Sequence, residues 1–145
     1  MYYLETEQSF DSAHFLKGYD GKCKNIHGHR WRVVIEIESP TLQKEGQTQG
    51  MIVDFSRLKQ DLKEETDYFD HSLIMETGSL KPDTFTALKE EGFLLVEVNF
   101  RPTAEEFSRY FYEKMSQRGY EVKSAKVYET PANCASYGED CHGRL

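Results

Sequence analysis

The chain has 145 residues, of which 30% are charged and 38% are hydrophobic, and it carries a formal net charge of −7. This length predicts a single domain, residues 1–145, with enough apolar side chains for a buried core. The acidic balance disfavours non-specific nucleic-acid binding, which depends on basic surface, and no apolar run approaches the ~20 residues that a membrane span needs. Because the N-terminus also lacks the pattern of a secretory signal, we expect a cytoplasmic protein without nucleic-acid or membrane partners.

Two strands are predicted first, over residues 2–15 and 27–38, because both segments are rich in β-forming residues. The turn-rich segment 18–25 between them predicts an antiparallel pair. Residues two apart in a strand point to the same face. His27 and His29 should therefore share a face with the apolar residues of the second strand, which are Trp31, Val33, Ile35 and Ile37.

A metal site is predicted where these two strands meet. Antiparallel pairing can bring His14, near the end of the first strand, beside His27 and His29. Three imidazoles that converge suit Zn²⁺, which prefers nitrogen and sulfur ligands. Two other interpretations stay open: the histidines can simply pack or face solvent, and Cys23, four residues before His27, can be a fourth ligand that closes a structural site.

The middle of the chain predicts helices and short extended segments. Asp54 is an expected N-cap for an amphipathic helix over 55–66, and one or two helical turns are expected at 85–91, followed by a short strand at 93–98. Between them, Asp70 precedes His71. A carboxylate can orient an imidazole, although an adjacent pair in a loop can also be merely solvated.

The C-terminal part predicts a second long helix and two strands. Thr103 and Glu106 have the spacing of a capping box, and the helix that they begin should end at Gly119. Strands are expected at 120–130 and 134–138. Glu129 ends an apolar run, so its carboxylate either meets water at the sheet edge or points into a pocket. A second metal site formed by Cys134, Cys141 and His142 is a weaker possibility, since no fourth ligand is evident.

Seven motifs follow one another in a characteristic order. They are Phe-Asp-Ser-Ala-His at 10–14, Cys-x-x-x-His-Gly-His at 23–29, Val-Asp-Phe at 53–55, Asp-His at 70–71, Pro-Thr-Ala-Glu at 102–105, Glu-Thr at 129–130 and Tyr137. The set resembles the 6-pyruvoyltetrahydropterin synthase family. That resemblance implies an α+β T-fold, or tunnelling fold: an antiparallel four-stranded sheet with two helices on one face, in the order ββααββ, here with an insertion at about 76–100 between the helices. It also implies a homohexamer, a dimer of trimers, whose active sites lie between subunits.

The resemblance further assigns roles to individual residues. His14, His27 and His29 match the family's zinc ligands, and Cys23 matches its catalytic cysteine. The resemblance also implies that Asp70 and His71 complete the catalytic relay, that Glu129 anchors the pterin and joins the relay, and that Thr103 lies near the pterin pocket. Lys22, Lys24 and Arg101 are candidate triphosphate contacts or ordinary surface charges, and Arg101 stands where family members often have Asn.

The implied substrate is 7,8-dihydroneopterin triphosphate. In the branch of the family that the chain resembles more, a zinc-dependent carbon–carbon lyase gives 6-carboxy-5,6,7,8-tetrahydropterin, acetaldehyde and triphosphate, in the synthesis of queuosine and other 7-deazaguanines. Two alternatives stay open: elimination of triphosphate alone, which gives 6-pyruvoyltetrahydropterin, and a zinc- and pterin-binding protein without turnover.

Overall fold

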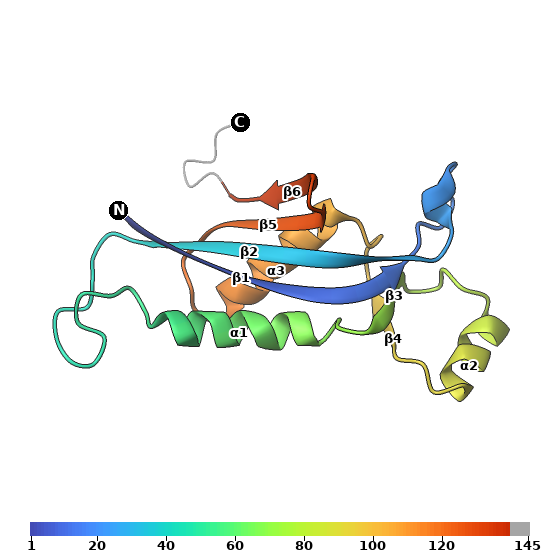
Figure 1. The fold of residues 1–145 in the computed structure, drawn as a ribbon, viewed down its shortest axis with the longest axis horizontal. Coiled ribbons are helices and arrows are strands. Elements are labelled where there is room, and N and C mark those ends of the chain that lie inside the picture. The colour runs from blue at the N-terminus through green and yellow to red at the C-terminus, as the bar shows by residue number, and fades with distance from the viewer. Residues whose placement is uncertain (140–145) are drawn as a thin grey trace.

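A computed structural model describes residues 1–139 of the chain (Figure 1). The strands are β1 (Tyr2–His14), β2 (His27–Ser39), β3 (Ser72–Glu76), β4 (Leu95–Val98), β5 (Val122–Thr130) and β6 (Asn133–Tyr137), the helices are α1 (Phe55–Asp67), α2 (Pro82–Glu90) and α3 (Ala104–Gln117), and a short 3-10 helix, η1, spans Lys22–Lys24. Cys141 and His142 lie outside the described residues. None of the helices that the structure describes is long and apolar enough to cross a membrane.

The strands form one mixed sheet in the order β4-β3-β1-β2-β5-β6. The strands β1, β2, β5 and β6 pair antiparallel as expected, whereas β3 runs parallel to both β1 and β4. The predicted four-stranded antiparallel sheet and the order ββααββ are therefore wrong in this detail. Strand β3 was not predicted because its apolar run, Leu73 to Met75, is too short for periodicity to identify.

Residues 76–100, where an insertion is predicted, form a crossover that extends the sheet. Parallel neighbouring strands cannot be joined by a tight turn and need a longer connection, usually a helix. Here α2 supplies it and carries the chain from β3 to β4. Helix α2 lies at one end of the molecule, away from the other two helices (Figure 1), and none of its residues is fully buried.

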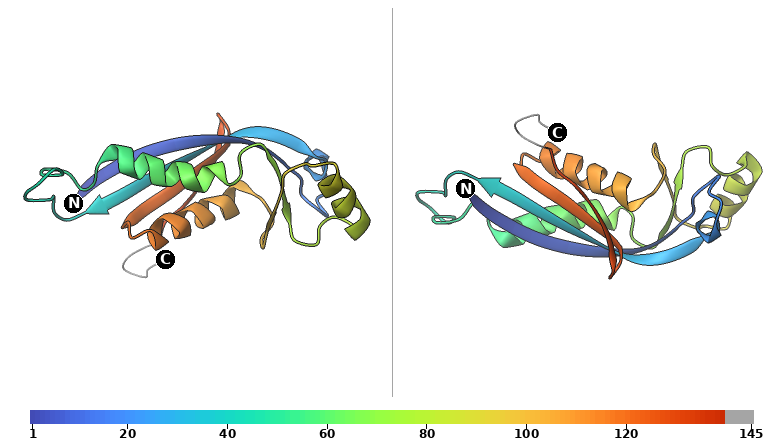
Figure 2. Two further views of the ribbon diagram at one scale, coloured as in Figure 1. Left: turned by 90° about the horizontal axis from the view of Figure 1, so that it is seen from below. Right: turned by 90° about the horizontal axis from the view of Figure 1, so that it is seen from above.

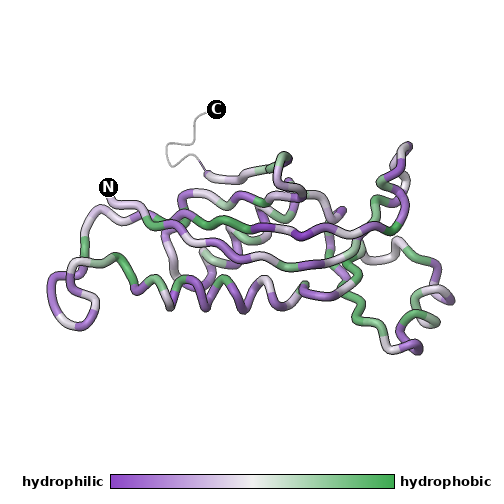
Figure 3. Tube along the Cα trace, viewed as in Figure 1, coloured by the Kyte–Doolittle hydropathy of each residue, from purple (hydrophilic) through white to green (hydrophobic). Residues whose placement is uncertain are grey.

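Helices α1 and α3 cover one face of the sheet, as expected (Figure 2). The side chain of Asp54 accepts a hydrogen bond from the Ser56 amide at 2.9 Å, and that of Thr103 accepts one from the Glu106 amide at 3.2 Å, so both predicted caps are confirmed. Apolar residues recur along the middle of β2, whereas the outermost part of the loop between β2 and α1 is hydrophilic (Figure 3).

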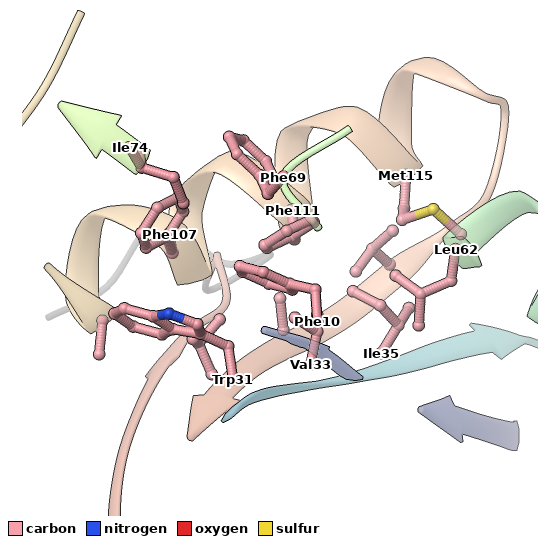
Figure 4. Packing of buried hydrophobic residues seen from close by; sticks show 14 of the residues in the cluster. Phe10, Trp31, Val33, Ile35, Leu62, Phe69, Ile74, Phe107, Phe111 and Met115 are labelled. Carbon is pink, nitrogen blue, oxygen red and sulfur yellow. The ribbon is translucent and has the colours of Figure 1, made fainter. Parts of the chain in front are cut away.

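The core lies between the sheet and these two helices (Figure 4). The predicted apolar face of β2 is buried here: Trp31, Val33 and Ile35 are each 0% exposed. Aromatic rings fill the end of the core nearest the histidines, where Trp31 packs edge-on against Phe107 with centroids 5.1 Å apart. The strand register pairs His14 with His27, and Ser12 with His29, so the expected juxtaposition of the three histidines is confirmed.

Candidate metal centre and active site

Three histidines and one glutamate converge at the adjoining ends of β1, β2 and β5. One ligand atom from each of His14, His27, His29 and Glu129 lies within 4.8 Å of every other. His14 is almost fully buried, and the other three side chains are partly exposed. The geometry follows from the pleat, because His27 and His29 point to one face of β2 and strand pairing places His14 and Glu129 on either side of them.

Two backbone carbonyls fix the orientation of His14 and His27. His14 Nδ1 lies 2.8 Å from the Pro102 carbonyl oxygen, and His27 Nδ1 lies 2.7 Å from the Asn25 carbonyl oxygen. A carbonyl can only accept, so each Nδ1 carries the proton and each neutral ring has its lone pair on Nε2. Carbonyl partners of this kind typically orient metal-binding histidines.

The chemistry of this donor set fits a cation. The Nε2 atoms of His14 and His27 are 3.1 Å apart, and two acceptors this close repel unless a positive group lies with them. His29 Nε2 is buried and makes no hydrogen bond of good geometry, although Glu129 Oε1 lies 3.0 Å from it. Imidazole nitrogens with a carboxylate suit Zn²⁺ and several other divalent transition metals.

Burial keeps the histidines in the form that a metal needs. Desolvation lowers the pKa of His14 below its usual range, partly opposed by the hydrogen bond to Pro102. Desolvation also lowers the pKa of His29, partly opposed by the nearby charge of Glu129. Both rings therefore favour the neutral state, which leaves a lone pair for coordination.

Cys23 lies in η1, on the loop of residues 15–26 that joins the ligand-bearing ends of β1 and β2 and is called the Cys23 loop below. The Leu16 amide donates to the Cys23 carbonyl at 2.9 Å and closes the base of this loop. The thiol is partly exposed. It is not among the four groups that converge within metal-binding distance; Glu129 is the fourth member of that cluster.

Asp70 and His71 form a hydrogen-bonded pair at the start of β3. Asp70 Oδ2 lies 2.9 Å from His71 Nδ1, while Asp70 Oδ1 accepts from the Asp11 amide at 2.9 Å. The hydrogen bond from the Asp11 amide, together with the His71 ring, holds the pKa of Asp70 below its usual range. His71 has a φ of 59°, which is unusual for a residue other than glycine, and the bent backbone lets adjacent side chains meet.

The structure does not join this pair to the histidine cluster within one chain. The His71 amide donates to the carbonyl of Asp11, three residues before His14 on β1, which is about 10 Å along a strand. No hydrogen bond or ion pair within residues 1–139 links His71 to Cys23, His14, His27 or His29.

The remaining candidates lie at the start of α3 and on the Cys23 loop. Thr103 caps α3, directly after Pro102, whose carbonyl accepts from His14. Arg101 Nη2 donates to the Lys17 carbonyl at 3.3 Å. The side chains of Lys22 and Lys24 are exposed.

Two features of the site were missed by sequence reasoning. The carbonyls of Asn25 and Pro102 orient ligands, yet a main-chain group leaves no signal in residue type. A depression of about 330 Å³ also borders the cluster, lined by His29, Glu129, Arg32, Tyr128 and their neighbours. Arg32 stacks on the Tyr128 ring, 3.8 Å from its centroid; an alternating strand pattern predicts their shared face but not this contact.

Comparison with known proteins identifies relatives along nearly the whole chain. Residues 3–140 match the family model described as 6-pyruvoyl tetrahydropterin synthase. The 6-carboxy-5,6,7,8-tetrahydropterin synthase of Haemophilus influenzae is 36% identical over 142 residues, which cover 96% of this chain and 100% of that protein. The protein of the same name from Aquifex aeolicus is 32% identical, over 82% of this chain and 77% of its own.

Solved structures share the fold. An uncharacterized protein from Wolinella succinogenes superposes with a TM-score of 0.77 at 21% identity, covering 96% of this chain and 98% of that one. The 6-pyruvoyl tetrahydropterin synthase of Caenorhabditis elegans gives a TM-score of 0.67 at 22% identity, covering 96% of both chains. The family match over residues 3–140, together with the full-length relative at 36% identity, shows that this chain belongs to the 6-pyruvoyl tetrahydropterin synthase family.

Proposed function

We propose that the protein is a zinc-dependent lyase that converts 7,8-dihydroneopterin triphosphate and water to 6-carboxy-5,6,7,8-tetrahydropterin, acetaldehyde and triphosphate, in queuosine and 7-deazaguanine synthesis in the cytoplasm. The observation that carries the proposal is the convergence of His14, His27, His29 and Glu129 within 4.8 Å. The Haemophilus and Aquifex relatives, which are 6-carboxy-5,6,7,8-tetrahydropterin synthases by name, favour the carboxy product over the pyruvoyl product.

In this proposal the three histidines hold the metal and Glu129 binds the substrate. Bound zinc would act as a Lewis acid that lowers the proton affinity of the substrate's side-chain oxygens. The carboxylate of Glu129 would accept hydrogen bonds from the 2-amino and ring N–H groups of the pterin, a bidentate contact that fixes its orientation. The depression of about 330 Å³ beside Glu129 offers space for part of that ring.

Cys23 is the proposed base. As a thiolate it would remove a proton from the substrate side chain, and His71 would exchange that proton while Asp70 holds the imidazole. The contact of 2.9 Å between Asp70 and His71 supports the second part of this relay.

The proposal includes a shared active site. Within residues 1–139 of one chain, no hydrogen bond or ion pair joins His71 to Cys23 or to the histidine cluster. We infer that the Asp70–His71 pair acts on the site of a neighbouring subunit, and that the protein assembles as a homohexamer, a dimer of trimers. Thr103 would then reach the pterin pocket from the start of α3.

Product analysis tests this function. The zinc-loaded protein is incubated with dihydroneopterin triphosphate, and products are identified by mass spectrometry. Carboxytetrahydropterin with acetaldehyde supports the proposal. Pyruvoyltetrahydropterin without acetaldehyde would mean that the same site eliminates triphosphate only. Tight pterin binding without any product would mean that the protein binds pterin without turnover.

A further inference from the structure

Arg101 lies between the metal centre and the loop that carries Cys23. It immediately precedes Pro102, whose carbonyl accepts the hydrogen bond of 2.8 Å from the buried ring of His14. The Thr103 amide donates back to the Arg101 carbonyl at 2.7 Å. The backbone of Arg101 is therefore tied to the fixed end of α3 and to a metal-ligand candidate.

The side chain of Arg101 points the other way, onto the Cys23 loop. Its Nη2 donates to the Lys17 carbonyl at 3.3 Å, and its guanidinium carbon lies 5.7 Å from the centroid of the Tyr19 ring. The planar guanidinium can donate in its plane and contact an aromatic face at the same time, which a lysine ammonium cannot reproduce.

Tyr19 transmits this contact to the turn that holds Cys23. The ring lies so close to Gly21 that a Cβ added at that glycine would come within 2.6 Å of Tyr19 Cε1. Gly21 is the residue before η1, and its carbonyl accepts from the Lys24 amide at 3.2 Å. The ring of Tyr19 thus packs against the backbone from which the turn around Cys23 begins.

The same turn reaches the metal centre at its other end. The amide and the side chain of Asn25 both donate to the Lys22 carbonyl, at 3.1 Å and 3.0 Å. The carbonyl of Asn25 accepts from His27 Nδ1 at 2.7 Å. The loop is therefore fixed at one side by His27 and at the other by Arg101.

We propose that Arg101 is a positioning residue, which clamps the Cys23 loop through Lys17 and Tyr19 and so sets the place of the thiol relative to the histidine cluster. This role differs from a direct contact with the substrate's triphosphate. The expected effect of Arg101 on turnover rests on the proposed function of Cys23 as the base. The positioning of the loop by Arg101 does not depend on that function.

The test separates the clamp from a charge that binds triphosphate. In Arg101→Gln, kcat should fall on the order of 10–100-fold, since small misplacements of a reacting group cost this much, while KM stays nearly constant. Arg101→Lys should fail to restore kcat, because the ammonium lacks the planar fork. Lys17→Ala is the matched control: it removes a nearby positive charge and keeps the carbonyl that Arg101 contacts. A raised KM with kcat retained, or full rescue by lysine, would overturn the clamp.

A second measurement does not require turnover. Alkylation of Cys23 by iodoacetamide is followed by mass spectrometry of the Cys23 peptide. It should become faster in Arg101→Gln and in Tyr19→Ala. It should also become faster in Gly21→Ala, because the added Cβ pushes the Tyr19 ring aside. The double variant Arg101→Gln with Tyr19→Ala should be alkylated at the same rate as either single variant, because both substitutions remove the same contact between Arg101 and the loop. Additive effects, or an unchanged alkylation rate, would overturn the proposal. Faster alkylation in a protein whose wild type gives no product would support the clamp and reject the lyase function.

Discussion

His14 Nε2 faces His27 Nε2 across 3.1 Å, and each ring is held in this orientation by a carbonyl oxygen on its Nδ1. Neither nitrogen can donate to the other when both rings are neutral. The arrangement therefore suits a bound cation, to which both nitrogens can offer a lone pair.

Removal of one clustered histidine should remove the metal. We expect His29→Ala to lower zinc affinity by more than about 100-fold, since even changes to residues behind the ligands cost about 10–100-fold. His71→Ala is the matched control, because His71 contacts Asp70 rather than the cluster. Zinc is measured by elemental mass spectrometry after dialysis. Equal loss from both variants would contradict the assigned ligand set.

Replacement of the proposed base should separate turnover from metal binding. Cys23→Ala should abolish product formation and leave zinc content nearly unchanged, because Cys23 is not one of the four converging groups. Cys134→Ala, which removes an exposed thiol on β6, should keep both product formation and zinc content. Loss of zinc from Cys23→Ala would instead move this residue into the ligand set.

Glu129 can serve the pterin or the metal, since its Oε1 lies 3.4 Å from His14 Nε2 and 3.0 Å from His29 Nε2. We expect Glu129→Gln to weaken pterin binding by about 1.5–3 kcal/mol, the contribution of hydrogen bonds to a charged group, while zinc is retained. Calorimetric titration with a pterin measures the pterin affinity, and metal analysis of the same sample measures the zinc content. Unchanged pterin affinity with reduced zinc content would make Glu129 a ligand rather than an anchor.

Thr103 has a structural role that any activity test must separate. Its side chain caps α3, so Thr103→Ala should lower the free energy of unfolding by about 1 kcal/mol. Thr103→Asn keeps a capping oxygen and should fold with nearly normal stability in urea denaturation. If Thr103 also contacts the pterin, both variants should bind it more weakly. Normal binding by Thr103→Asn would restrict this residue to capping.

The Asp70 carboxylate should contribute to stability only where it is ionised. Its pKa is lowered first by the Asp11 amide and then by His71, so the contribution is present above the unfolded pKa of about 3.9 and is lost as the pH falls through the lower, folded value. The side chain is 38% exposed, which limits the effect to at most about 1 kcal/mol. The difference in urea midpoint between the wild type and Asp70→Asn should therefore shrink in acid; a difference that grows there would contradict this.

Elements whose signals are local could be predicted from the amino-acid sequence. Alternation along β2 places His27 and His29 on the buried side with Trp31, because the pleat has a period of two. The caps at Asp54 and Thr103 follow from residue type and spacing. Antiparallel pairing was enough to predict His14 beside His27 and His29, and the structure confirms this juxtaposition.

Features that depend on distant segments of the chain could not be predicted in this way. The short strand expected at 93–98 is confirmed as β4, but the five-residue strand β3 and its parallel pairing with β4 were not predicted, because such short strands are specified by the partners they pair with rather than by their own pattern. The carbonyls of Pro102 and Asn25 orient His14 and His27, and the side chain of Arg101 reaches Lys17 across 84 positions of sequence. These contacts depend on where the folded backbone brings main-chain atoms, and residue type does not encode that position.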